Sequence, residues 1–176
     1  MRNFIITLWV VSTGLAICPR AYSESTNLPI TFYIVRDQKF EGGRFFDSFP
    51  FPKLGYISSK PDLTVTHLKA LSLEETRDQP AHFADRNGKT RKGKVIYPGR
   101  LFFTLMDQDF QRLRVLAKKP AGHRLLVMHG ERPLTLTSIA DAAETPVFWT
   151  SLNTANRAEL EIMEDELKKL LPSGAH

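Results

Sequence analysis

The distribution of apolar and polar residues after residue 27 predicts a chain of mixed strands and helices. Residues 28–36 (LPITFYIVR) are rich in β-branched and aromatic side chains, which predicts a first strand. Loosely alternating stretches at 54–58 and 63–73 predict two further strands, joined by a turn at Ser59-Lys60-Pro61-Asp62. Strands are also expected at 101–106, 123–129 and 147–152, while 134–143 fits either a short strand or a helical turn.

Two segments repeat their apolar residues with helical spacing. One helix is predicted from Asp107 or Asp109, either of which can cap it, to about Lys119. The other begins near residues 153–156 and ends at Leu171, with an apolar stripe of Leu160, Met163, Leu167 and Leu170. Together these elements predict an α+β domain at residues 24–176. We expect an antiparallel sheet with two helices on one face, a ferredoxin-like sandwich with an N-terminal β extension.

Residues 37–53 contain a cluster of aromatic rings. Because prolines stand on both sides of one phenylalanine, helix is disfavoured there, and we expect an ordered loop pinned by its aromatic side chains. The rings can form a small satellite core against the sheet. They can instead form an exposed patch that binds an apolar segment of a partner. The candidate partner-binding residues are Phe45, Phe46, Phe49 and Phe51.

Residues 74–100 form the polar and basic middle of the chain. The pair Asn87-Gly88 favours a tight hairpin turn, so part of this basic loop is expected to be an exposed β-ribbon. A basic run is often only a solvated face. Alternatively, it docks an acidic partner or anionic lipid headgroups. The candidate residues for steering such a partner are Arg86, Lys89, Arg91 and Lys92.

Residues 1–23 have the pattern of a cleaved signal peptide. A basic start at Arg2 precedes an apolar run, and Ala21 and Ser23 provide the small residues that a signal peptidase accepts. The predicted location of the mature chain is therefore periplasmic or secreted. Retention of the run as a membrane anchor and lipidation of Cys18 are the alternatives. Removing Arg2 and Arg20 but no acid lowers the formal charge from +5 to +3.

Composition and motifs exclude several classes of function. Cys18 is the only cysteine, so the mature chain can form no disulfide, zinc-thiolate site or cysteine nucleophile. No G-x-S-x-G, H-E-x-x-H or phosphate-loop signature is present, and no histidine pair has the spacing of a helical metal site. Because these motifs are missing, we expect no enzyme activity, no cofactor and no metal. We also expect no nucleic-acid partner, because the excess positive charge is modest.

The order of elements after Arg100 is similar to a known export protein. Residues 123–134 (HRLLVMHGERPL) resemble the strand and glycine turn of the head subdomain in the large periplasmic domain of SecD, a protein-export subunit. Residues 156–171 resemble the helix that follows. The resemblance covers about residues 101–171. It departs from the SecD pattern at His129, where an aspartate is usual, and around Thr137-Ser138, where a small residue and a proline are missing. It implies contact with a polypeptide, without the membrane spans that SecD needs for proton-driven work.

The sequence therefore predicts an exported, non-enzymatic binding module that contacts another envelope or secreted polypeptide. Exposed strand edges can capture an extended chain, and membrane-surface contact is also open. An inhibitor or immunity protein against a secreted enzyme is one alternative, with residues 85–94 as its projecting loop. A small-molecule or lipid-binding protein is another, and it requires an enclosed apolar cavity.

Overall fold

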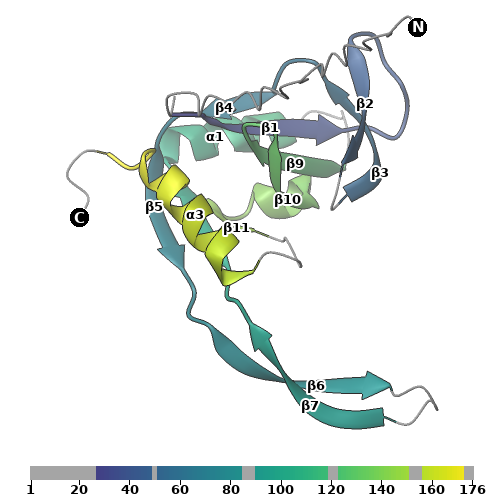
Figure 1. The fold of residues 1–176 in the computed structure, drawn as a ribbon. Helices are drawn as coiled ribbons and strands as arrows, with labels where there is room; N and C mark the ends of the chain where they lie inside the picture. The colour runs from purple at the N-terminus through teal and green to yellow at the C-terminus, as the bar shows by residue number, and fades with distance from the viewer. Residues whose placement is uncertain (1–26, 49–50, 85–89, 119–122, 151–155, 173–176) are drawn as a thin grey trace, which may run out of the picture.

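The structure is a computed structural model that describes residues 27–48, 51–84, 90–118, 123–150 and 156–172. Figure 1 shows a layered body from which one long ribbon projects. The predicted signal peptide at 1–23 lies outside the described residues. The fold is mixed α+β, with mostly antiparallel sheets and few helices, which confirms the predicted class.

A four-stranded antiparallel sheet forms the centre of the body. Its strands are β1 (Ile30–Val35), β4 (Leu63–Val65), β9 (Arg124–His129) and β10 (Arg132–Ser138), in the order β10-β9-β1-β4. The predicted first strand and the strand at 123–129 are confirmed. In β1 the residues from Phe32 to Val35 are all buried, so this strand has apolar partners on both faces. The two faces are covered by different parts of the chain.

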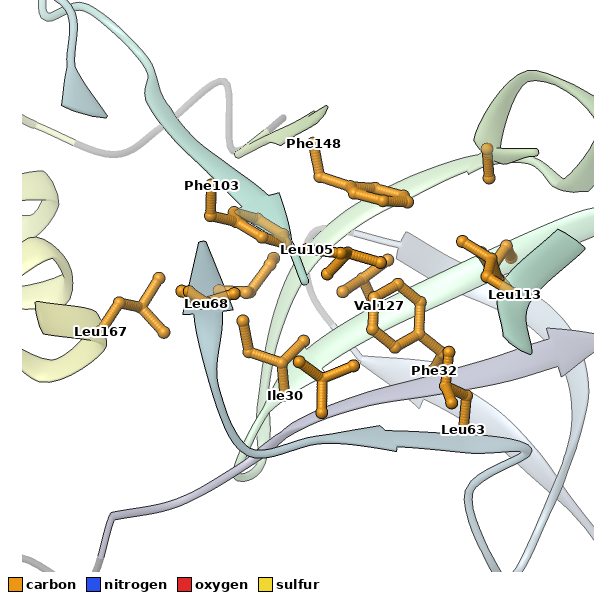
Figure 2. Packing of buried hydrophobic residues seen from close by; sticks show 14 of the residues in the cluster. Ile30, Phe32, Leu63, Leu68, Phe103, Leu105, Leu113, Val127, Phe148 and Leu167 are labelled. Atoms are coloured by element: carbon orange, nitrogen blue, oxygen red, sulfur yellow. The ribbon is translucent and has the colours of Figure 1, made fainter. Parts of the chain in front are cut away.

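A three-stranded sheet packs against the first face of the central sheet. It contains β5 (Leu68–Leu73), β8 (Leu101–Leu105) and β11 (Val147–Trp149), in the order β11-β8-β5. The ring of Phe148 packs edge-on against Phe32 of the central sheet at 5.5 Å and stacks on Phe103 at 5.6 Å. Figure 2 shows these rings meeting between the two sheets. The main core therefore lies between the sheets.

The predicted strand at 63–73 is divided in two. Its first part, β4, pairs with β1 in the central sheet, and its second part, β5, pairs with β8 in the three-stranded sheet. The chain changes sheets at Thr66-His67. This division explains why neither alternating face of the segment is purely polar, since each half belongs to a different sheet. The turn at 59–62 is held by Asp62, whose carboxylate accepts a 2.8 Å hydrogen bond from the N–H of Ile34.

Two longer helices, α1 (Asp107–Ala117) and α3 (Arg157–Lys168), bury their apolar stripes in the main core. The side chain of Asn156 caps α3 by accepting a 2.9 Å hydrogen bond from the N–H of Glu159. The predicted cap of α1 is wrong, because its N-cap is Met106 and makes no side-chain hydrogen bond. Asp107 and Asp109 instead lie in the first turn, where a negative charge is favourable to the helix dipole.

The ambiguous segment at 134–143 contains both a strand and a helical turn. It forms the end of β10 and then the short helix α2 (Ile139–Ala142). Ser138 stands at the junction, and its hydroxyl accepts hydrogen bonds from the N–H groups of Ala140 and Asp141. Beyond α2, β11 confirms the start of the strand predicted at 147–152, while residues 151–155 lie outside the described ones.

The second face of the central sheet is covered by a hairpin where the sequence predicted a loop. The loop predicted at 37–53 is wrong for β2 (Gly43–Ser48) and for the start of β3 (Phe51–Ser58), which pair with each other in antiparallel register. The strand predicted at 54–58 is confirmed as the rest of β3. Tyr56 of β3 and Arg36, just after β1, exchange backbone hydrogen bonds of 2.9 and 2.8 Å. Apart from this bridge the described hairpin is a two-stranded sheet, so a proline at position 52 is compatible with an outer strand edge. A second buried cluster lies beneath it, formed by Tyr33, Val35, Phe46, Leu54, Ile57, Leu126 and Met128.

The basic middle of the chain forms the predicted exposed ribbon. Strands β6 (Arg77–Ala84) and β7 (Thr90–Tyr97) pair with each other in antiparallel register and extend away from the body, as Figure 1 shows. The base of the ribbon is tied to α3. Nη1 of Arg157 donates to the carbonyl oxygens of Glu74 at 2.6 Å and of Pro98 at 3.3 Å. These two carbonyls lie where the chain enters and leaves the ribbon.

Gly99 allows the two chains at the base to approach closely. Its φ is +92°, and a Cβ atom at this position would overlap the carbonyl oxygen of Glu74. We expect Gly99→Ala to lower the free energy of unfolding by about 2 to 4 kcal/mol, because both backbone strain and a steric clash are introduced. Urea unfolding followed by circular dichroism would measure this loss.

The matched control is Gly42→Ala. Gly42 also has a positive φ, +72°, but nothing lies within 4 Å of the added Cβ. The free energy of unfolding of Gly42→Ala should fall by only about 1 to 2 kcal/mol, because alanine is strained in the left-handed backbone conformation. An equal loss for the two variants would show that the close approach at Gly99 contributes nothing.

Candidate functional site

The phenylalanines predicted to bind a partner are separated by the hairpin. Phe46 is buried in the second cluster, so it belongs to the satellite core. Phe45, its neighbour on β2, is 50% exposed and packs edge-on against Tyr56 at 5.2 Å. Phe51 lies in β3 but its side chain is not described, and Phe49 lies outside the described residues. Of this set, only Phe45 is shown at the surface.

The basic residues predicted to steer a partner fall on the ribbon as far as they are described. Arg91 and Lys92 lie on β7, whereas Arg86 and Lys89 lie outside the described residues. Since side chains alternate across a strand, Lys92, Lys94 and Ile96 share one face of the ribbon. Arg91, Val95 and Tyr97 share the other face.

Both faces of the ribbon are open to solvent and cationic. Its two described strands contain four basic residues and one acid, a net charge of +3, and the acid Asp78 pairs with Lys94 at 3.3 Å. The apolar side chains of Val95 and Ile96 are 46% and 71% exposed. Sequence reasoning missed these two residues, although Val95-Ile96-Tyr97 interrupts the basic run with a visible apolar segment. The ribbon thus combines positive charge with bare apolar area.

The base of the ribbon contains a network of side-chain interactions. The Glu74 carboxylate pairs with Arg77 at 3.2 Å and accepts a 3.2 Å hydrogen bond from the Tyr97 hydroxyl. Burial raises the pKa of Tyr97, and the nearby Arg100 opposes that shift. The guanidinium groups of Arg77 and Arg100 lie over the Tyr97 ring at 5.0 and 5.9 Å. This network links the two chains of the ribbon at its base.

A partly enclosed surface hollow lies between β10, α2 and β11. It has a volume of about 300 Å3 and is lined by Thr135, Leu136, Thr137, Asp141, Ala142, Thr145, Val147, Phe148 and Trp149. The lining is mainly apolar, and the Trp149 side chain is 42% exposed. The volume stands at the lower end of the range of roughly 300 to 1,000 Å3 that is typical of ligand pockets. Sequence reasoning missed this hollow, because its walls come from segments that meet only in the folded chain.

The two histidines of the β9 region have different surroundings. His123 is exposed just before β9, whereas His129, the last residue of β9, is buried. Nε2 of His129 lies 3.1 Å from the carbonyl oxygen of Leu28, and because a carbonyl only accepts, Nε2 donates. Burial lowers the pKa of His129 below its ordinary value of 6.5, while the Glu166 carboxylate, 3.7 Å from Nδ1, opposes that shift.

This shift makes stability depend on pH. The unfolded chain takes up a proton at His129 near pH 6.5, whereas the folded chain does so only at lower pH. The free energy of unfolding should therefore fall as the pH drops from about 7 through 6.5 and below. We expect His129→Gln to flatten this dependence relative to the parent chain, measured by urea unfolding at several pH values. A parallel His123→Gln variant, altered at an exposed site, should keep it. Identical slopes for all three chains would contradict the prediction.

Within the described ranges, no three His, Cys, Asp or Glu side chains are grouped as a metal site would require. Among the same residues, no helix combines the length and apolar character needed to cross a bilayer. Comparisons of this chain with protein-family models, with curated proteins and with solved structures find no match. The ribbon, the hollow and the exposed ring of Phe45 are the surface features that can bind a partner.

Proposed function

We propose that this chain is an exported, non-enzymatic binding module whose β6–β7 ribbon contacts another polypeptide of the envelope or outside the cell. The observation that carries the proposal is the ribbon itself, cationic on two open faces with Val95 and Ile96 exposed. An isolated two-stranded ribbon is only marginally stable in water. Covering its apolar residues and pairing its outer edges with a partner would stabilise it.

The charge of the ribbon selects the kind of partner. Lys92 makes no ion pair with a described residue, and it lies on the same face as Lys94 and the exposed Ile96. A partner surface with acidic residues around an apolar patch would complement this face. Positive charge at the rim of an interface mainly accelerates association, while the buried apolar contact slows dissociation. The two contributions can be separated by mutation.

The resemblance to the SecD head supports a polypeptide partner. We propose that residues 101–171 are related to that subdomain and to the ferredoxin-like sandwich. The order of elements in this segment, β8-α1-β9-β10-α2-β11-α3, supports the relation. The four strands are divided between two sheets, with β9 and β10 in one and β8 and β11 in the other, which differs from the single sheet of a ferredoxin-like sandwich. The role proposed by resemblance is contact with a polypeptide, without proton-driven work.

An inhibitor of a secreted enzyme is the second candidate. The observation that favours it is the tied base of the ribbon, where Arg157 holds the entering and leaving chains together. A rigid projection can occupy the cleft of an enzyme with little loss of entropy on binding. In that case the captured partner would be an enzyme, and one equivalent of this chain would abolish its turnover. A partner that keeps full activity in the complex would eliminate this candidate.

The test of the first candidate is capture of a partner from envelope extract, followed by binding kinetics with that partner. We expect the double variant Arg91→Glu and Lys92→Glu to slow association about tenfold at low salt, because charge reversal removes electrostatic steering. Ile96→Ser should instead accelerate dissociation about tenfold or more. Surface plasmon resonance at several salt concentrations separates these effects.

The control carries a similar change elsewhere on the surface. Lys60, an exposed residue of the turn after β3, allows a charge reversal away from the ribbon. Lys60→Glu should leave both rates within about twofold of the parent chain. If the ribbon variants and the control bind alike, the ribbon is not the contact surface and the proposal fails.

A further inference from the structure

We propose that the hollow between β10, α2 and β11 is a second binding site, which takes a short extended polypeptide segment with an aromatic side chain pointing inward. The segment adds as an antiparallel strand to the edge of β10 that has no neighbouring strand among the described residues. This inference rests on the proposed polypeptide-binding function. It concerns a surface distinct from the ribbon, so the two can be tested independently.

The two sheets are joined differently at their two sides. On one side the chain passes directly from β4 to β5, so the edge strands of both sheets are continuous through Thr66-His67. On the other side β10 ends the central sheet and β11 ends the three-stranded sheet. Helix α2 connects them at one end, and the hollow lies between them. The hollow therefore lies at the side where no direct strand-to-strand connection joins the two sheets.

The backbone of β10 presents a hydrogen-bonding edge at the hollow. The N–H of Ile139 donates to the carbonyl oxygen of His123 at 3.0 Å, and Ser138 stands opposite Arg124. In an antiparallel ladder this pattern makes Ser138 and Arg124 a non-hydrogen-bonded pair, so the backbone groups of Leu136, two residues earlier, also point away from β9. Leu136 lines the hollow. Its outward N–H and C=O groups can pair with an added strand.

A buried polar group at the hollow has no hydrogen-bond partner among the described residues. Thr135 is only 5% exposed, and its hydroxyl makes no hydrogen bond to another described residue. Thr135 stands opposite Val127, a residue of the main core, so its side chain lies on the inner face of the central sheet. Burying a hydroxyl without a hydrogen bond is unfavourable. A bound segment that supplies a polar atom here would satisfy it.

The walls of the hollow define the side chains that fit. Phe148 and Trp149 provide aromatic surface, and aromatic rings pack favourably on one another. Asp141, an acidic residue of α2, also lines the hollow. A strand antiparallel to β10 has its N-terminal part near α2, and alternate side chains point to the same face. The fitting segment therefore has a basic residue two positions before an aromatic one.

The test uses a defined peptide and the full chain carrying Trp9→Phe, in which Trp149 is the only tryptophan and reports binding by fluorescence. The probe is the blocked hexapeptide acetyl-Thr-Lys-Val-Phe-Val-Thr-amide. We expect saturable binding that weakens at least tenfold when the peptide's Phe is replaced by Ala. Free toluene, which does not absorb at the wavelength that excites tryptophan, is titrated in parallel. Saturable binding of toluene without binding of the peptide would identify a small-molecule pocket and overturn the proposal, as would no binding of either.

Two modified peptides test the pairing with β10. One carries N-methyl groups on both Val residues, and the other carries them on Lys and Phe. Because only one alternate set of N–H groups faces a paired strand, one peptide should bind like the parent and the other at least tenfold more weakly. Equal affinities for the two, whether kept or lost, would overturn strand addition.

Thr135→Val separates binding from folding. The variant removes the hydroxyl and keeps the shape of the side chain, so the melting temperature should be unchanged or higher, while peptide affinity falls about fivefold or more. Ile162→Ala, at an exposed apolar residue of α3, is the control and should leave peptide affinity unchanged. Unaltered peptide affinity in Thr135→Val would show that the hydroxyl does not contact the bound peptide, contrary to the proposal. Ribbon variants should bind the hexapeptide normally, so failure of the ribbon proposal and of this one are distinguishable.

Discussion

The arrangement of the whole chain follows from the need to cover the central sheet on both faces. Strands β1 and β9 bury nearly every side chain that they carry, and the side chains alternate between two apolar clusters. A sheet of this kind cannot leave either face in water, because each exposed apolar residue would forfeit its burial free energy. The three-stranded sheet with α1 and α3 covers one face, and the β2–β3 hairpin covers the other. What remains outside these layers is the ribbon, whose apolar residues have no covering element among those described.

Much of the fold could be predicted from local pattern, and the exceptions have physical causes. The strands at 28–36, 101–106 and 123–129 were predictable from their runs of apolar residues, and the helix ending near Leu171 from an apolar periodicity that matches its buried face. The strand at 54–58 was predictable, but its partner β2 and the start of β3 were missed, because Pro50 and Pro52 are local signals against regular structure, whereas the pairing is decided by the cluster beneath the hairpin. The segment 63–73 reads as one strand, since nothing in its sequence reveals that the chain changes sheets at Thr66-His67.

The candidate sites also differ in how far the sequence predicts them. The exposed ribbon was predictable from Asn87-Gly88 and the surrounding basic residues, because a tight turn between polar strands is a short-range signal. The separation of Phe45 from Phe46 was not, since it depends on the alternation of a strand that the sequence did not reveal. The hollow beside Trp149 needs three segments, β10, α2 and β11, to meet in space. A single sequence contains no periodicity from which such a meeting can be derived.

The ribbon and the hollow share one property: each has a group in an unfavourable environment. In the ribbon it is an apolar side chain in water, and in the hollow it is a buried polar group. In the ribbon, Ile96 lies in solvent beside lysines, although the base is fixed by Arg157 and the Glu74 network. In the hollow, the Thr135 hydroxyl is buried without a hydrogen bond to any described residue, beside the outward-pointing backbone of Leu136. Elsewhere the chain satisfies such groups closely, as Asp62 does for Ile34 and Thr150 does for Leu101. Such groups lower the stability of the free chain. A second polypeptide that covers the apolar side chain or hydrogen-bonds the polar group would remove this cost, and the free energy recovered would favour binding.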